Sequence, residues 1–166
     1  MREASELRGA IESASSEALA AFGSGAVYVE KFLEKARHVE VQCLGDSHGN
    51  AIHLFDRDCS SQRRHQKLIE EAPAPAVDPV KRLETAEAAA RLLREAGYCG
   101  AATVEFLMDA NGDYSMLEVN TRVQVEHCVT EMVTGIDIVQ ASIRVAAGEP
   151  LGIDQSEVKL NGHSCL

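Results

Sequence analysis

Two glutamates, Glu105 and Glu118, lie in a segment whose pattern predicts a β-hairpin. The sequence between them contains Asn111-Gly112, a dipeptide favoured in two-residue type I′ turns because both central residues need a positive φ. The two glutamates would then oppose each other within apolar runs, where like charges destabilise a sheet. Counting outward from this turn predicts three cross-strand pairs on one face: Leu107 with Met116, Glu105 with Glu118, and Thr103 with Asn120.

A divalent cation between the opposed carboxylates would remove this conflict. Oxygens from Glu105, Glu118 and the amide of Asn120 suit a hard ion such as Mg²⁺ or Mn²⁺, which usually keeps waters and also binds substrate phosphates. Two other interpretations stay open at this point. One glutamate could have a raised pKa, or the register could slip by one residue and expose one of the pair.

Polar side chains continue at every second position beyond the hairpin. An arginine there can hold a planar oxyanion through two parallel hydrogen bonds, and Glu126 is close enough in sequence to act as a base. The pattern predicts an anion site beside the cation, and the alternative is the solvated face of an amphipathic strand. If the segment is extended, the residues that share this face are Glu118, Asn120, Arg122, Gln124 and Glu126.

Two further segments carry polar groups. The stretch SQRRHQK, residues 61–67, concentrates donors in an acidic protein, which favours oxyanion or phosphate binding, although a solvated loop tip balanced by Glu70 and Glu71 is the alternative. In an extended chain Arg63, His65 and Lys67 would share one face, and Gln62, Arg64 and Gln66 the other.

In VYVEKFLEKARHVEVQ a strand would enter a short connection whose backbone could bind a heterocycle. A lone histidine such as His38 is more typical of a structural donor.

The helices and strands that must position these groups can be predicted from the spacing of apolar residues and from the residues typical of helix ends and turns. Asp78-Pro79 and Gly97 are typical of the start and end of a helix, and its apolar stripe, including Leu83, Ala86, Ala90 and Leu93, should pack against a sheet. Strand pairs with two or three helices indicate an α+β domain with an antiparallel sheet and packed helices. We expect helices at 3–21, 79–96 and 136–147, strands at 26–32, 38–44 and 51–55, and a turn at 46–50.

Size, charge and cysteine content narrow the function classes. The 166 residues fit one domain, and a net charge of −10 with a pI near 5.0 disfavours nucleic acid as a partner while leaving small phosphorylated ligands plausible. The five cysteines are scattered without a C-x-x-C spacing, which fits a reducing, cytoplasmic setting. No apolar run approaches transmembrane length, so the sequence predicts no membrane association.

Four segments, VYVEKFLEKARHVEVQ, RDCSSQRRHQKLIEEAPAP, GAATVEFL and LEVNTRVQVEHCVTEMVTGIDIV, resemble the biotin carboxylase family of the ATP-grasp superfamily, in the right order. The resemblance implies an ATP-grasp fold and an enzyme, an ATP-dependent ligase. Glu30, Lys31, Phe32 and Leu33 would hold adenine, His38 would approach the ribose, and Gln62 and His65 would contact nucleotide phosphates. Glu105, Glu118 and Asn120 would hold Mg²⁺ or Mn²⁺, while Lys67, Arg122, Gln124 and the Val125 backbone would hold bicarbonate and Glu126 would take its proton.

The implied ligands and partners are ATP, bicarbonate, biotin on a biotin carboxyl carrier protein, and carboxyltransferase subunits, with a homodimer for the full-length form. Against the family pattern, residues 1–166 correspond to part of the ATP-grasp domain, without the glycine-rich loop, the N-terminal domain or the C-terminal domain. We therefore expect little or no turnover by this chain alone. Cys128 stands where the family motif is expected to have a proline, and residues 164–166 diverge. The competing hypotheses are a non-catalytic remnant that binds Mg-nucleotide or associates with carboxylase subunits, and, more distantly, a carbamoyl-phosphate-type ligase.

Overall fold

The computed structural model describes residues 3–64, 66–75 and 77–166, in two units, Met1–Phe32 and Leu33–Leu166. In the first unit a 3₁₀ turn, Ala4–Glu6, leads into helix α1, Leu7–Phe22, which ends at Gly23 in the left-handed conformation. Residues 24–32 have no regular secondary structure, so the strand predicted at 26–32 is wrong. A β-branched pattern forms a strand only beside a partner, and Tyr28, Val29 and Phe32 are all exposed.

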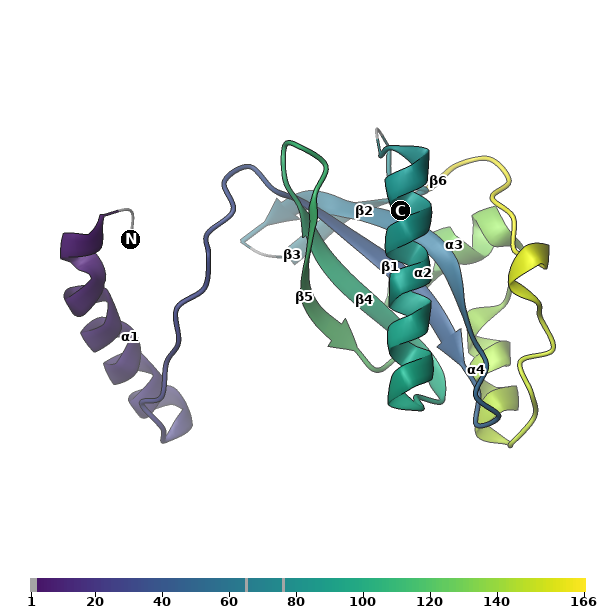
Figure 1. The fold of residues 1–166 in the computed structure, drawn as a ribbon, viewed down its shortest axis with the longest axis horizontal. Coiled ribbons are helices and arrows are strands. Elements are labelled where there is room, and N and C mark those ends of the chain that lie inside the picture. Colours follow the sequence, from purple (N-terminus) through teal and green to yellow (C-terminus); the bar gives the residue numbers. More distant parts are fainter. Residues whose placement is uncertain (1–2, 65, 76) are drawn as a thin grey trace. The chain divides into compact units, whose positions relative to one another are not determined.

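A six-stranded antiparallel sheet forms the second unit (Figure 1), as the sequence predicted for the fold class. The strand order is β5-β4-β1-β2-β3-β6. The strands are β1 Arg37–Gly45, β2 Ala51–Arg63, β3 Gln66–Ala72, β4 Gly100–Met108, β5 Tyr114–Asn120 and β6 Ser164–Cys165. The helices are α2 Pro79–Ala96, α3 His127–Thr134 and α4 Ile138–Ala146, with a 3₁₀ turn at Gln155–Glu157. Within the described residues no helix is long and apolar enough to cross a membrane.

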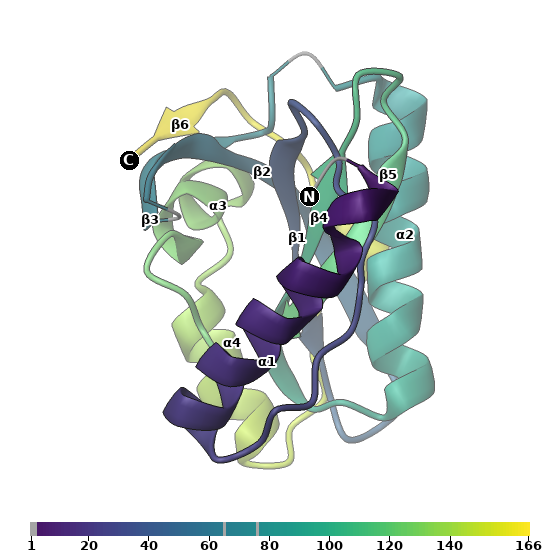
Figure 2. The same cartoon turned by 90° about the vertical axis from the view of Figure 1, so that its left-hand side faces the viewer.

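The two faces of this sheet differ in chemistry because side chains alternate along each strand. Helix α2 covers one face, and α3 and α4 lie on the other (Figure 2). Toward α2 the central strands present small and apolar side chains such as Val41, Cys43 and Val104, which pack against the alanines of α2 and Leu93. The intervening residues of the same strands, among them Glu40 and Glu105, face the opposite side. The predicted site residues of these strands therefore lie opposite α2.

Helix α2 begins and ends where the sequence indicated. Asp78 accepts hydrogen bonds from two backbone amides of the first turn, Pro79 is the first helical residue, and Gly97 ends the helix with a positive φ of 62°. The prediction that Leu83 packs on the sheet is wrong, because its side chain is exposed. At that turn of the helix Arg82, rather than Leu83, points toward the sheet, and its guanidinium pairs with the buried Asp56 of β2.

The β4–β5 hairpin has the predicted carboxylate pair but a different turn. The chain reverses over Asp109 to Asp113, with the Asp109 carboxylate accepting from two backbone amides, so the strands start one residue out of the predicted register and Leu107 pairs with Ser115. A β-bulge beyond Phe106 then restores the register. Glu105 lies opposite Glu118, and Thr103 opposite Asn120, as the sequence predicted.

Candidate active site

The Lys67 ammonium is the centre of the cleft on the polar face of the sheet. Its Nζ donates to three carboxylates from different elements: Glu40 Oε2 of β1 at 2.6 Å, Glu105 Oε1 of β4 at 3.1 Å, and Glu126 Oε1 just before α3 at 2.6 Å. Burial opposes the charge on Lys67, but the Glu40 and Glu126 carboxylates outweigh burial and raise its pKa above the ordinary value. The lysine is therefore charged and bridges strands that are distant in sequence.

The buried Glu105 carboxylate lies close to hydrogen-bond donors from several other residues. Asn120 Nδ2 lies 2.8 Å and Gln124 Nε2 3.0 Å from its Oε1, which Lys67 also contacts, and His38 Nε2 lies 2.7 Å from its Oε2. Burial would raise the pKa of Glu105. The contacts with His38, Lys67 and Gln124 prevail and lower that pKa to about 2. Glu105 is an ionised carboxylate at neutral pH.

The opposed glutamates do not conflict in the way that the sequence suggested. Glu118 is exposed, so only Glu105 is desolvated, and the Asn120 amide lies between them, with Nδ2 also 3.4 Å from Glu118 Oε1. The two carboxylates and the Asn120 amide nevertheless line the same cleft. If the Asn120 amide turned by half a rotation, it would present oxygen instead of nitrogen, and this all-oxygen donor set fits Mg²⁺.

The segment after β5 leaves the sheet earlier than predicted. Regular strand structure ends at Asn120, and Glu126 is the residue that precedes α3, so the prediction of one extended face through residue 126 is wrong. The side chains still share one cleft of about 1030 Å³. Arg122 is exposed and contacts Asn120 Oδ1 through Nη2 at 3.4 Å, whereas Gln124 and Glu126 are buried. The cleft is lined by His38, Gln62, Gln66, Lys67, Leu68, Glu70, Glu105, Leu107, Leu117, Glu118, Asn120, Arg122, Gln124, Val125 and Glu126.

The pairing of β2 with β3 changes the predicted division of the polar side chains near Gln62 and Lys67. Gln62 pairs directly with Lys67 across the strands, so both face the cleft, whereas an uninterrupted extended chain would have separated them. Gln62 Nε2 lies 2.8 Å from His38 Nδ1, which links two predicted nucleotide residues. His65 lies outside the described residues. Arg64, with a positive φ of 54°, is exposed at the turn.

The four residues predicted to hold adenine fall at the boundary between the units. Glu30, Lys31 and Phe32 end the first unit, and Leu33 begins the second. All except Leu33 are exposed, and none is in regular secondary structure. Their role in nucleotide binding stays a prediction.

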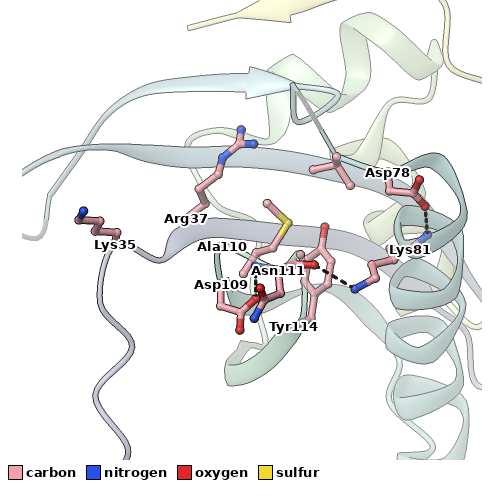
Figure 3. A pocket seen from close by; sticks show the side chains of 11 residues that line it. Lys35, Arg37, Asp78, Lys81, Asp109, Ala110, Asn111 and Tyr114 are labelled. Atoms are coloured by element: carbon pink, nitrogen blue, oxygen red, sulfur yellow. Dashed lines mark hydrogen bonds between the residues drawn. The ribbon is translucent and has the colours of Figure 1, made fainter.

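Two site residues were missed by pattern reasoning. Glu40 alternates with His38 along β1, and this spacing could have indicated a shared face. Arg57 of β2 donates to Glu40 Oε1 and Gln124 Oε1 from a fully buried position, and no local signal predicts a buried arginine. A second cavity, of about 510 Å³ beside the β4–β5 turn, is lined by residues such as Lys35, Arg37 and Lys81 and by none of the predicted site residues (Figure 3).

The chain is similar to ATP-binding domains and to carboxylases. A family model described as "Carbamoyl-phosphate synthase L chain, ATP binding domain" matches residues 1–154. Biotin carboxylase of Allochromatium vinosum is 55% identical over 158 residues, which cover 95% of this chain and 35% of that protein. Methylcrotonoyl-CoA carboxylase subunit alpha, mitochondrial, of Rattus norvegicus is 52% identical over 164 residues, 99% of this chain and 23% of that protein.

Solved structures give the same result. The biotin carboxylase of Campylobacter jejuni, in a complex with β-γ-ATP, matches with a TM-score of 0.92 and 53% identity, over 98% of this chain and 36% of that chain. The biotin carboxylase domain dimer of Hydrogenobacter thermophilus 2-oxoglutarate carboxylase, with MgADP, ADP and bicarbonate, matches with a TM-score of 0.90 and 47% identity, over 97% of this chain and 36% of that chain. This chain spans between about a quarter and just over a third of these proteins.

Proposed function

Because the chain belongs to the carbamoyl-phosphate synthase L chain ATP-binding family and, within it, to the biotin carboxylases of the ATP-grasp superfamily, we propose that its cleft binds bicarbonate beside Mg-ATP. The observation that carries the proposal is the convergence of Lys67, Arg122, Gln124 and Glu126 on one cleft. They come from β3 and from the segment between β5 and α3. Two cations and an amide donor suit a small planar oxyanion, and a carboxylate beside them suits its deprotonation.

Each residue has a distinct part in this proposal. The exposed Arg122 guanidinium can hold two oxygens of bicarbonate, and Lys67 contributes a point charge. Gln124 and the Val125 backbone supply neutral donors. Lys67, Arg122 and Glu126 are the catalytic residues, because they touch the reacting anion.

Glu126 would act as the base, and the geometry suggests how its basicity changes. Burial opposes ionisation of Glu126, but the hydrogen bond from Lys67 outweighs burial and lowers its pKa. Bicarbonate would compete for the same ammonium and draw it away from Glu126. Loss of that donor would raise the pKa of Glu126, so the base becomes stronger when its substrate is present.

The deprotonated anion attacks the γ-phosphorus of ATP to give carboxyphosphate and ADP. Carboxyphosphate then breaks down to CO₂ and phosphate, and CO₂ carboxylates a ureido nitrogen of biotin, whose N–H proton passes to the phosphate. Glu105, Glu118 and Asn120 would hold Mg²⁺ or Mn²⁺, which when bound neutralises developing phosphoryl charge. For the nucleotide, we assign adenine to residues 30–33, the ribose to His38, and the phosphates to Gln62 and His65.

In the complete enzyme the carboxyl acceptor would be biotin on a biotin carboxyl carrier protein, and carboxyltransferase subunits would use the product. A homodimer would be the assembly of the full-length form. The five free cysteines support a reducing compartment such as the cytoplasm. A non-catalytic remnant that binds Mg-nucleotide is the competing function, and the following experiment distinguishes the two.

The test is a chimera in which this chain replaces the matching segment of the Campylobacter jejuni biotin carboxylase, assayed for bicarbonate-dependent ATP hydrolysis. Glu126→Gln keeps the shape and removes the base, so kcat should fall by roughly two to four orders of magnitude with little change in the KM for ATP. Arg122→Lys keeps the charge and loses the planar guanidinium that donates two parallel hydrogen bonds, so bicarbonate affinity and turnover should both fall. A folded, nucleotide-binding chimera without bicarbonate-dependent hydrolysis would favour the remnant.

A further inference from the structure

Arg57 is the largest side chain that the structure buries completely, at 0% exposure. It projects from β2 between the sheet and α3 and does not line the cleft. Its nitrogens reach five acceptors on four other segments of the chain. They are Glu40 Oε1 at 2.7 Å from Nε, Gln42 Oε1 and Thr130 Oγ1 at 2.9 Å from Nη1, and Thr103 Oγ1 at 3.3 Å and Gln124 Oε1 at 3.2 Å from Nη2.

The guanidinium only donates, and this dictates how its neighbours are oriented. Gln124 must turn its amide oxygen toward Arg57, so its Nε2 points the other way and donates to Glu105. Glu40 likewise gives one oxygen to Arg57 and leaves the other for Lys67. The donor side of Gln124 and the place of the Lys67 ammonium both depend on Arg57, which does not itself line the cleft.

We propose that Arg57 is a positioning residue for the anion site: its guanidinium fixes the Gln124 amide with nitrogen toward the cleft and, through Glu40, holds Lys67 in place. The identity of the anion rests on the proposed function. The orientation of Gln124 and Lys67 does not, because it follows from hydrogen bonds within the chain.

Lysine cannot replace arginine in this position. A lysine keeps the charge but has no planar fork, so it cannot serve Glu40 and Gln124 together at these separations. With Arg57→Lys the Gln124 amide oxygen would lose its charged donor, and only the hydrogen bond from Nε2 to Glu105 would still hold the amide in this orientation. A role limited to holding β2 against α3 would lower stability without changing the orientation of Gln124.

The first test is side-chain amide hydrogen exchange of the 166-residue chain, followed by NMR. Arg57→Lys should speed exchange of the Gln124 amide protons by at least about tenfold, while the Asn50 amide, bound to Asp46, stays protected. The matched control is Arg82→Lys. Arg82 also pairs with a buried carboxylate of β2, Asp56, but from α2 on the other face of the sheet. Equal protection of Gln124 in the wild type and in folded Arg57→Lys would overturn the proposal.

The second test is bicarbonate affinity of the same proteins, measured by titration with ¹³C-labelled bicarbonate. Arg57→Lys should weaken bicarbonate binding by about ten- to a hundredfold, by analogy with the outer-shell partners of metal ligands, and leave MgADP affinity unchanged. Arg82→Lys should change neither. Parallel loss of both affinities would mean a structural role and overturn the proposal. If the wild type binds no bicarbonate, the proposed function fails, while amide exchange still decides the role of Arg57.

If Arg57→Lys does not fold, Thr130→Val gives the answer. Thr130 Oγ1 contacts the guanidinium and none of the cleft residues, and valine matches its shape. Loss of this one acceptor should speed Gln124 exchange in the same direction by a smaller factor. An unchanged exchange rate in folded Thr130→Val, together with unfolding of Arg57→Lys, would refute positioning through the guanidinium.

Discussion

Glu105 shows how a charge conflict in a sequence is resolved by residues far away in the chain. The hairpin pattern predicts Glu105 opposite Glu118, and the structure confirms that pair. The neighbours that neutralise Glu105, Lys67 on β3 and His38 on β1, lie outside the hairpin. The local sequence pattern predicts which residues pair within a hairpin. It cannot predict contacts across three or four strands, because these depend on the strand order.

Replacing Glu105 and Glu118 together by glutamine should abolish Mn²⁺ binding, because both carboxylate ligands are lost. The structure also predicts lower stability for Glu105→Gln alone, since Lys67 and His38 lose a buried partner, whereas the exposed Glu118→Gln should change stability by less than about 0.5 kcal/mol. Water-proton relaxation measures the metal and thermal unfolding measures the stability.

The control for that experiment is Glu84→Gln combined with Glu95→Gln, which removes two exposed carboxylates from α2 on the other face of the sheet. It should keep Mn²⁺ affinity. Unchanged affinity in the Glu105 and Glu118 double variant would exclude the proposed metal site.

Asp46 gives a pH prediction at the β1–β2 turn. Its carboxylate accepts from the His48, Asn50 and Leu151 backbone amides and from the Asn50 side chain. Burial acts against the charge, but these donors lower the pKa of Asp46 from 3.8 to about 2. A lowered folded-state pKa stabilises the fold above the unfolded value, and this contribution is lost as the pH falls from about 3.8 toward 2.

Urea unfolding of the wild type and Asp46→Asn between pH 2 and 7 measures this contribution. The wild type should be the more stable protein above about pH 4.5, and the difference should close as the pH approaches 2. A difference in unfolding free energy that stays constant with pH would show that the Asp46 charge contributes nothing.

At the scale of elements, two departures from simple patterns cancel in the β4–β5 hairpin. The longer turn shifts the register by one residue, and the bulge beyond Phe106 shifts it back. The sequence thus predicts the carboxylate pair correctly and the Leu107 pair incorrectly. Helix α2 was predictable to the residue, because Asp78, Pro79 and Gly97 are strong local signals. The strand predicted at 26–32 rested on residue types alone, and among the described residues the structure gives this segment no strand to pair with.

Cys128 is the second residue of α3, a place where proline is well tolerated because the first-turn amides lack helical partners. Cys128→Pro should stabilise the protein by about 0.4–1 kcal/mol by restricting the unfolded chain. Chemical denaturation measures the change, and Cys128→Ala is the control, since it removes the thiol without restricting the backbone. A proline variant less stable than the alanine variant would mean that the α3 start does not accept the ring.

At the scale of the whole molecule, the net charge of the chain does not show where its cations lie. The net charge of −10 would repel anions in general. The cleft nevertheless has Lys67 and Arg122 in its lining together with amide donors, four glutamates and the buried Arg57 behind Gln124. Composition disfavours a polyanion as partner. Lys67 on β3 and Arg122 after β5 reach the same cleft from separate segments, which composition cannot reveal, and this supports the proposal of a small anion as ligand.

Titration of the chain with ¹³C-labelled bicarbonate in the presence of MgADP shows whether this cleft is a bicarbonate site. We predict saturable binding that Arg122→Lys weakens by at least about tenfold, because the bidentate fork is lost, and that Arg91→Lys, an exposed arginine on α2, leaves unchanged. Binding that does not saturate, or that is equally strong in the wild type and in Arg122→Lys, would contradict the account.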